Sequence, residues 1–351
     1  AQQDYVLSLR HRQDPEVQRR LALSLAISGE KEAALNVIAA QLRRNDRAAW
    51  RTQALVLAII PVYNIGGYIN RSCCTRANQL GPEEQGFRGN ARNLDLNRDF
   101  IKADAANTRS FYRIFHQWQP DVFVDTHTSN GADYQCIMTL ISTQKDKLAP
   151  PVAEFLTQSL DPALYAGMEA AGFPMAPYVY TRKGTPESGI MGFMETPRYS
   201  TGFTALFNTI GYVTEAHMLK TYTERVEATY AFLDVLVQQA EEKHTELQEA
   251  RKQARQLAHS SLAVRWELDT TSSSMIDFLG YEAGEKISRA TGLPRLFYDT
   301  AKPLTFQVPF YNDYVPTVTI EQPQAYIVPQ AWHEVVDLLK LNNVKMQRLT
   351  T

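Results

Sequence analysis

The chain has 351 residues, of which 44% are hydrophobic and 21% are charged, and its formal net charge is −2. These values are ordinary for a folded protein of two or three domains, and they exclude a disordered chain, a collagen-like repeat and a disulfide scaffold. The charge balance gives no reason to expect nucleic-acid binding, and no apolar run is long enough for a transmembrane helix.

The first 59 residues are rich in Ala, Leu and Arg and contain one Pro and one Gly. Apolar residues at helical spacing predict one helix after Asp14, a second through Ala33–Leu42 and a third after Asn45. The repeat length of about 34 residues resembles a tetratricopeptide repeat followed by the start of another. Such repeats bury their faces against neighbours, so we expect residues 1–59 to be a helical segment that offers a docking surface to a protein partner.

From residue 54 onward, apolar runs predict strands of a mostly parallel sheet. Ala54–Tyr63 is apolar on both faces, and the later runs are Asp121–Asp125 and Ile210–Thr214. Helical patterns such as Thr108–Trp118 lie between the runs, and this alternation predicts an α/β sheet with helices on its faces.

The rest of the chain predicts one long helix and then a small C-terminal region. Residues 223–259 have a helical pattern throughout. Residues 262–351 contain short strand patterns, among them 325–328, a helix over 330–341 and a last strand from Val344. We therefore expect three parts: a helical segment (1–59), an α/β domain (60–260) and an α+β extension (261–351).

Side chains that carry chemistry follow the predicted strands. His127 comes after the second strand, Glu215 comes after the third, and Arg88 and Arg98 lie in the loop after the first. Ligands of open α/β sheets bind beyond the carboxyl ends of the strands. A histidine, a glutamate and two arginines gathered at that edge would suit a hydrolase.

Four sequence blocks together resemble the zinc carboxypeptidase (carboxypeptidase A-like) family, most closely its bacterial secreted branch. The blocks are Pro61–Gly67 (PVYNIGG), Gly86–Phe100 (GFRGNARNLDLNRDF), Asp125–Thr128 (DTHT) and Thr214–Leu219 (TEAHML). The resemblance covers about residues 54–240, and segments of the C-terminal region resemble the extension of the same branch. It implies a carboxypeptidase-like fold in which the front of the domain is missing.

The resemblance also implies a role for individual residues. His127 matches the last zinc ligand, and Glu215 matches the glutamate that takes a proton from zinc-bound water. Arg88 matches the arginine that polarises the scissile carbonyl, while Asn97 and Arg98 match the pair that holds the terminal carboxylate of the substrate. The implied cofactor is Zn²⁺, and the implied partner is a peptide or peptide-like substrate with a free C-terminal carboxylate.

Three further residues stand near these positions. Asp125 is a candidate to orient His127 by a hydrogen bond. Tyr199 is a candidate for a mobile tyrosine on the substrate side, whereas a structural role is expected for His217.

The sequence departs from the family at the other two zinc ligands, which belong to an H-x-x-E motif upstream of the first strand. None of the seven histidines has Glu three positions later, and only His11 with Asp14 gives H-x-x-D. Catalytic zinc needs about three protein ligands and a water, so His127 alone cannot hold it. The chain is then a fusion that lost the front of the enzyme, a pseudoenzyme, or an enzyme whose missing ligands come from elsewhere.

The expected function is a zinc metallocarboxypeptidase that removes C-terminal residues from peptides, impaired by the missing motif. The alternatives are a non-catalytic protein that binds peptide carboxylates and a helical-repeat interaction protein that uses residues 1–59. The resemblance to the secreted branch predicts a periplasmic or secreted location.

Overall fold

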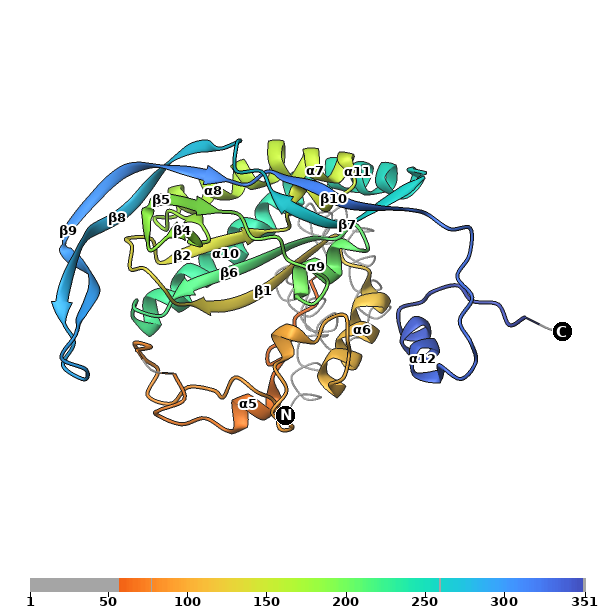
Figure 1. Cartoon of the computed structure of the whole chain (residues 1–351), viewed down its shortest axis with the longest axis horizontal. Coiled ribbons are helices and arrows are strands. Elements are labelled where there is room, and N and C mark those ends of the chain that lie inside the picture. Colours follow the sequence, from red (N-terminus) through yellow and green to blue (C-terminus); the bar gives the residue numbers. More distant parts are fainter. Residues whose placement is uncertain (1–56, 77, 259, 350–351) are drawn as a thin grey trace, which may run out of the picture. The chain divides into compact units, whose positions relative to one another are not determined.

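The computed structural model of the chain describes residues 57–76, 78–258 and 260–349 (Figure 1). The chain divides into two compact units, Ala1–Tyr63 with Leu236–Thr245, and Asn64–Val235 with Glu246–Thr351. The helices predicted before residue 57 lie outside the described residues. All the candidate site residues named above belong to the second unit.

The predicted first strand is wrong over its described part. Residues 57–63 form neither strand nor helix, and the side chains of Ile59 and Ile60 are 51% and 38% exposed. Pro61 lacks the N–H group that a central strand would donate to its neighbour, which works against pairing at this point.

The helices and strands of the described chain follow one another as a mixed α/β series. The helices are α5 (Ile65–Ile69), η1 (Leu96–Arg98), α6 (Ala106–Trp118), η2 (Lys145–Lys147), α7 (Pro150–Phe155), the π-helix η3 (Leu156–Leu160), α8 (Asp161–Ala170), α9 (Ser200–Ala205), α10 (Tyr222–Glu242), α11 (His244–Gln256) and α12 (His333–Leu341). The strands are β1 (Val122–Ser129), β2 (Met138–Ser142), β3 (Ala176–Pro177), β4 (Thr181–Lys183), β5 (Thr185–Met191), β6 (Ile210–His217), β7 (Ser261–Leu268), β8 (Ser274–Ile287), β9 (Pro294–Tyr311) and β10 (Tyr314–Glu321).

The central sheet has four strands in the order β1-β6-β2-β3. β1 runs parallel to β6 and β3 parallel to β2, whereas β2 and β6 are antiparallel. All eight residues of β6 are buried, as expected for a strand covered on both faces. The predicted fold class, a mixed and mostly parallel sheet flanked by helices, is confirmed.

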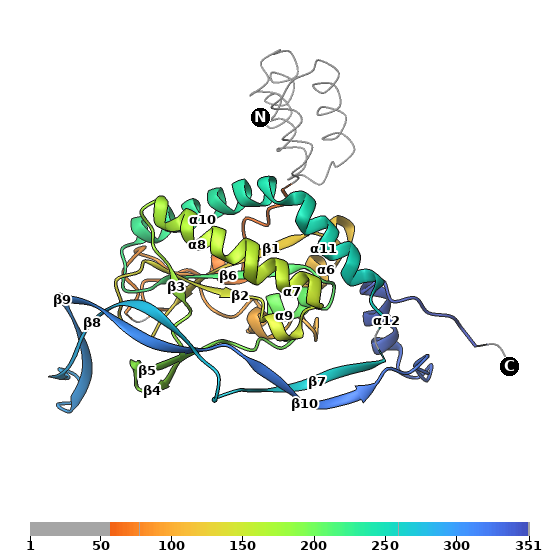
Figure 2. The ribbon, with the colours of Figure 1, turned by 90° about the horizontal axis from the view of Figure 1, so that it is seen from above.

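Both faces of this sheet carry helices. On one face, Phe203 of α9 stacks on Tyr112 of α6 with ring centres 4.5 Å apart, and Phe111 of α6 contacts Phe123 of β1. On the other face, Tyr212 of β6 contacts Phe232 of α10, and its hydroxyl donates to Asp161 of α8 at 2.9 Å. Figure 2 shows α8 and α10 along one side of the central strands and the long β8–β9 pair along the other.

A second sheet, in the order β4-β5-β9-β8, covers the edge of the domain, and β7 pairs with β10 in a separate ribbon. A buried cluster joins this second sheet to the main domain, with Ile190, Phe278 and Val308 packed around Tyr134 and Ala176. Long strands of the C-terminal region therefore contribute to the core beside the central sheet.

Several sequence expectations for the second half need correction. The single long helix is two helices, α10 and α11, which are separated at Lys243. β8 was not expected, and no strand forms at 325–328 or from Val344. Among the described residues, no helix combines the length and apolar character needed to cross a membrane.

Candidate functional site

Two parallel strands place His127 beside Glu215. β1 and β6 pair in parallel with His127 opposite Glu215, and Asp125 lies on the same face as His127, two residues earlier. The sequence predicted that these residues follow the strand ends, whereas both lie within the last residues of their strands. The pairing of neighbouring parallel strands brings the two side chains together at the carboxyl edge of the sheet.

The His127 ring lies between two carboxylates. Its Nε2 is 3.0 Å from Oδ2 of Asp125, and its Nδ1 is 3.6 Å from Oε1 of Glu215. Burial would lower the pKa of His127, but the two carboxylates outweigh burial and raise its pKa to about 10. Burial would likewise raise the pKa of Asp125, and the nearby His127 holds it below its usual value. The two carboxylates therefore favour the protonated form of the ring.

Arg98 ends the short helix η1, which is fixed by Asp95. The Asp95 side chain caps this helix by accepting a hydrogen bond from the backbone N–H of Asn97 at 3.0 Å. The Arg98 Nη1 donates to the carbonyl of Asn97 at 2.8 Å, and its Cζ lies 4.6 Å from the centre of the Tyr199 ring. Among the described residues, no carboxylate lies within ion-pair distance of Arg98. Arg98 is thus a positioned guanidinium without an anionic partner in this part of the chain.

Arg88 has a different environment. Its Nε donates to Oδ2 of Asp95 at 3.0 Å and its Nη2 lies 2.9 Å from the same oxygen, while the side chain is 49% exposed. The structure therefore places Arg88 in a surface ion pair with the residue that caps η1. Its predicted role at a scissile carbonyl, like that of Asn97 in substrate binding, stays a prediction.

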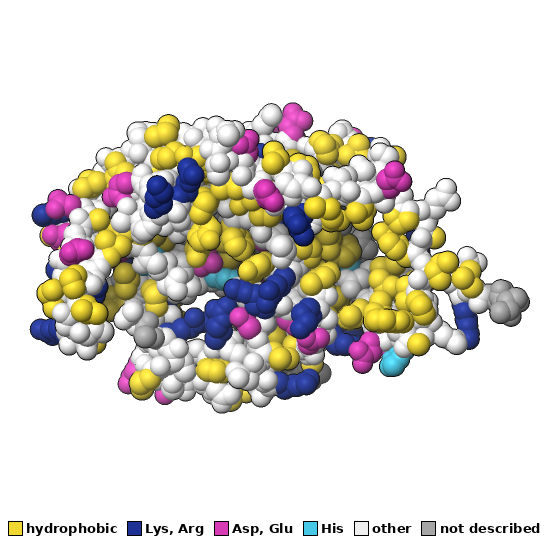
Figure 3. Space-filling view, in the orientation of Figure 1, with side chains coloured by type: hydrophobic (Ala, Val, Ile, Leu, Met, Phe, Trp, Pro, Cys, Tyr) yellow, Lys and Arg dark blue, Asp and Glu magenta, His cyan; other side chains and the backbone are white. Residues whose placement is uncertain are grey.

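A short series of contacts connects Arg98 to the histidine. Tyr199, on which Arg98 stacks, immediately precedes Ser200, the first residue of α9. Ser200 is fully buried and close enough to lower the pKa of Asp125, although its hydroxyl makes no hydrogen bond of good geometry among the described residues, so the start of α9 lies against the Asp125–His127 pair. Figure 3, which is drawn in the orientation of Figure 1, shows Lys and Arg side chains gathered along a hollow in the middle of the visible face.

The described residues do not fit a catalytic zinc ion. Such an ion needs about three protein ligands and an open position. No three His, Cys, Asp or Glu side chains in residues 57–76, 78–258 and 260–349 are grouped to hold a metal, and both ring nitrogens of His127 face carboxylates. His11 and Asp14, the H-x-x-D pair, lie outside the described residues.

His217 is a buried structural residue at the end of β6. Its side chain is fully buried, its Nδ1 accepts a hydrogen bond from the backbone N–H of Leu219 at 3.2 Å, and its ring meets that of Tyr134 at 4.7 Å. Burial lowers the pKa of His217 to about 4.

This burial predicts a loss of stability in acid. The unfolded chain binds a proton at His217 near pH 6.5, whereas the folded chain does so only near pH 4, so the stabilisation is complete above pH 6.5 and falls as pH falls towards 4. At pH 4.5, we expect the native chain to lose about 2–3 kcal/mol of unfolding free energy from this residue, relative to pH 7.5. His217→Asn should remove that component in urea unfolding, and the exposed control His333→Asn should not. An unchanged pH profile in His217→Asn would contradict this assignment.

Comparison with known proteins adds one partial likeness. No family model matches the chain, and no curated protein matches it. Among solved structures, it is similar to a metallo-carboxypeptidase from Pseudomonas aeruginosa in complex with (2-guanidinoethylmercapto)succinic acid. The identity is 16%, the TM-score is 0.37, and the match covers 57% of this chain and 52% of that chain. The chain thus matches about half the length of that enzyme.

Proposed function

We propose that the chain binds peptides by their free C-terminal carboxylate and that Arg98 is the residue that holds it. The proposal depends on one observation: the Arg98 guanidinium is fixed against the Tyr199 ring and has no carboxylate partner among the described residues. Another arginine of the same loop, Arg88, already binds Asp95.

The geometry favours a carboxylate as the ligand of Arg98. A guanidinium presents its N–H groups as a planar fork that matches the two oxygens of a carboxylate. Stacking on an aromatic ring leaves the edge of the guanidinium accessible while it restricts the plane. Asn97, adjacent to Arg98, is proposed from the family resemblance as a second contact to the carboxylate.

Calorimetric titration with two forms of one peptide tests this function. A short neutral peptide with a free C-terminus should bind at least about tenfold more tightly than the same peptide with a C-terminal amide, because only the acid forms a charge-assisted pair with Arg98. The preference should shrink at high ionic strength, since an accessible ion pair is screened. Equal affinity for acid and amide would contradict the proposal.

Hydrolysis of the bound peptide is the second candidate function. It is favoured by the placement of His127 next to Glu215, at the carboxyl edge of a parallel strand pair. The test is release of the terminal amino acid from a peptide acid, measured with and without added zinc chloride. Release that requires zinc and is lost in His127→Ala would support a metallocarboxypeptidase, whereas binding without release would support the pseudoenzyme alternative.

The remaining assignments rest on the sequence and are proposed on that basis. They are the division into residues 1–59, 60–260 and 261–351, a protein-docking role for 1–59, a periplasmic or secreted location, and a Zn²⁺ cofactor, for which the described residues alone supply too few ligands. Deletion of residues 1–50 should remove a docked partner and leave peptide binding intact.

A further inference from the structure

A cavity of about 360 Å³ lies at the edge of the central sheet and is distinct from the candidate peptide site. It is formed by segments from across the second unit: the end of β2, η3 with α8, β3, the loop after β5, and strands β8 and β9. None of the residues His127, Glu215, Arg98 and Tyr199 lines it. Its volume falls within the roughly 300–1,000 Å³ of small-molecule sites.

The cavity wall is mainly apolar and rich in aromatic rings. The four aromatic residues in the lining are Tyr165, Tyr178, Phe193 and Phe310, and they stand among aliphatic residues such as Leu140, Leu156 and Met175. Aromatic faces attract cations as well as apolar groups, because the ring carries negative charge on its face.

Two polar groups on α8 face this apolar space. The Asp161 carboxyl accepts a hydrogen bond from the Tyr212 hydroxyl with one oxygen, Oδ1, and burial raises the pKa of Asp161 to about 6. The Tyr165 hydroxyl, one turn further along α8, makes no hydrogen bond to any residue in the described part of the chain. α8 begins where the π-helix η3 ends, and such irregular turns are frequent at functional sites.

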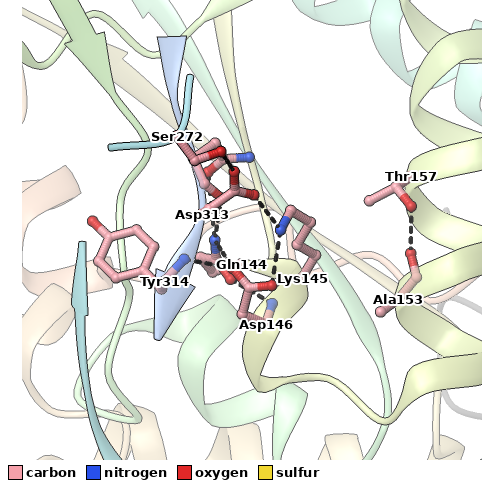
Figure 4. A network of polar contacts seen from close by, with 9 residues as sticks. Gln144, Lys145, Asp146, Ala153, Thr157, Ser272, Asp313 and Tyr314 are labelled. Atoms are coloured by element: carbon pink, nitrogen blue, oxygen red, sulfur yellow. Dashed lines mark hydrogen bonds and ion pairs between the residues drawn. The ribbon is translucent and has the colours of Figure 1, made fainter. Parts of the chain in front are cut away.

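Lys145, the cation at the rim of the cavity, is already paired with carboxylates. Lys145 Nζ lies 2.8 Å from Oδ1 of Asp146 and 2.8 Å from Oδ1 of Asp313, as Figure 4 shows. The same network ties Gln144 to Asn312 through a 2.9 Å hydrogen bond, so it fixes the junction of β9 and β10 to the cavity rim. For the other two charged residues in the lining, Asp161 and Asp277, the described part of the chain offers no paired cation.

We propose that this cavity is a binding site for a small organic ammonium ion with an apolar or aromatic body. Asp161 would accept the ammonium group, and the rings around it would pack on the rest of the molecule. An organic anion would meet two carboxylates and no available cation in the lining. A purely apolar ligand would strip water from the Asp161 carboxylate without replacing its hydrogen bonds, which is unfavourable.

Three probes of similar size and shape test the proposed charge preference. They are phenethylamine, the neutral 2-phenylethanol and the anionic 3-phenylpropanoate, titrated by ligand-observed NMR at pH 8, where Asp161 is ionised. We expect phenethylamine to bind at least about tenfold more tightly than the alcohol and the anion not to bind. Equal affinity for the amine and the alcohol would overturn the proposal.

Variants on either side of the cavity locate the bound amine. Asp161→Asn should abolish the preference for the amine over the alcohol, and Thr157→Phe, a larger side chain in the lining, should weaken both ligands. Glu169→Gln removes an exposed carboxylate from the same helix and is the matched control, with no change expected. Should Asp161→Asn fail to fold, Thr157→Phe still decides whether the ligand occupies this cavity.

The candidate peptide site also contains carboxylates, so a control must show that the amine does not bind there. Glu215→Gln should leave phenethylamine binding unchanged, because Glu215 does not line the cavity. Amine binding that is lost in Glu215→Gln, or kept unchanged in both Asp161→Asn and Thr157→Phe, would place the ligand elsewhere and contradict the inference.

Discussion

Arg98→Ala is expected to weaken binding of a peptide with a free C-terminal carboxylate about 100-fold, which corresponds to about 2.7 kcal/mol. The guanidinium is held by the Tyr199 ring 4.6 Å away and by the carbonyl of Asn97, so little side-chain freedom remains to be lost when the carboxylate arrives. Removing the side chain leaves the bound carboxylate without its charged partner. Calorimetric titration of native and variant chains at one ionic strength measures the change.

Three comparisons separate this specific contact from general positive charge. Arg98→Lys keeps the charge but loses the planar fork, and we expect a loss of about tenfold. Arg92→Ala removes an exposed arginine from the same loop and should change the affinity less than about twofold. The peptide amide should bind Arg98→Ala as weakly as the peptide acid does. Equal losses in the Arg92 and Arg98 variants would show that diffuse electrostatics, and not a carboxylate contact, governs binding.

The sequence was sufficient to predict that His127 and Glu215 lie close together. Both follow short runs of β-branched and aromatic residues, and helical patterns between such runs predict a parallel sheet whose carboxyl ends meet. The position of Asp125 follows from the two-residue period of a strand, which puts it on the same face as His127. These inferences needed only local pattern and the geometry of parallel strands.

Other features depended on contacts that no local pattern reveals. Arg88 and Arg98 stand ten residues apart in one loop, and only the folded loop shows that Asp95 pairs with Arg88, whereas no carboxylate among the described residues pairs with Arg98. The apolar run 54–63 resembled a central strand, yet its described part finds no strand to pair with. The position of Ser200 against Asp125 likewise arises from the packing of α9 on the sheet and gave no sequence signal.

The same limitation applies to Lys147 and Glu195, a buried ion pair formed by residues 48 positions apart. The Lys147 Nζ lies 2.7 Å from Oε1 of Glu195 and donates to the Glu195 backbone carbonyl at 2.5 Å. The Glu195 side chain is 1% exposed, and its Oε2 has no hydrogen-bond partner among the described residues. Burial raises the pKa of Glu195 and lowers that of Lys147 in spite of the pairing, so desolvation outweighs their attraction.

This balance predicts that removing only the lysine lowers the free energy of unfolding much more than replacing both residues with uncharged ones. Lys147→Met should lower the free energy of unfolding by about 3–5 kcal/mol near pH 8, because it leaves a buried carboxylate without its cation. Lys147→Met/Glu195→Gln should recover most of that loss, since the amide oxygen can still accept the hydrogen bond that the backbone N–H of Gln144 donates to Glu195 at 3.0 Å. Urea unfolding of the native chain, both single variants and the double variant gives the complete cycle.

The pH dependence of Lys147→Met distinguishes the effect of an unpaired buried charge from simple loss of packing. Without its cation, Glu195 should take up a proton more readily when folded than when unfolded, so the deficit of Lys147→Met should shrink as pH falls from 8 to 5. The double variant has no ionisable group at either position and should show no such recovery. A deficit that is the same at both pH values would mean that Lys147 contributes through its aliphatic stem, and the ion pair would then be irrelevant to the packing of the β5–α9 loop.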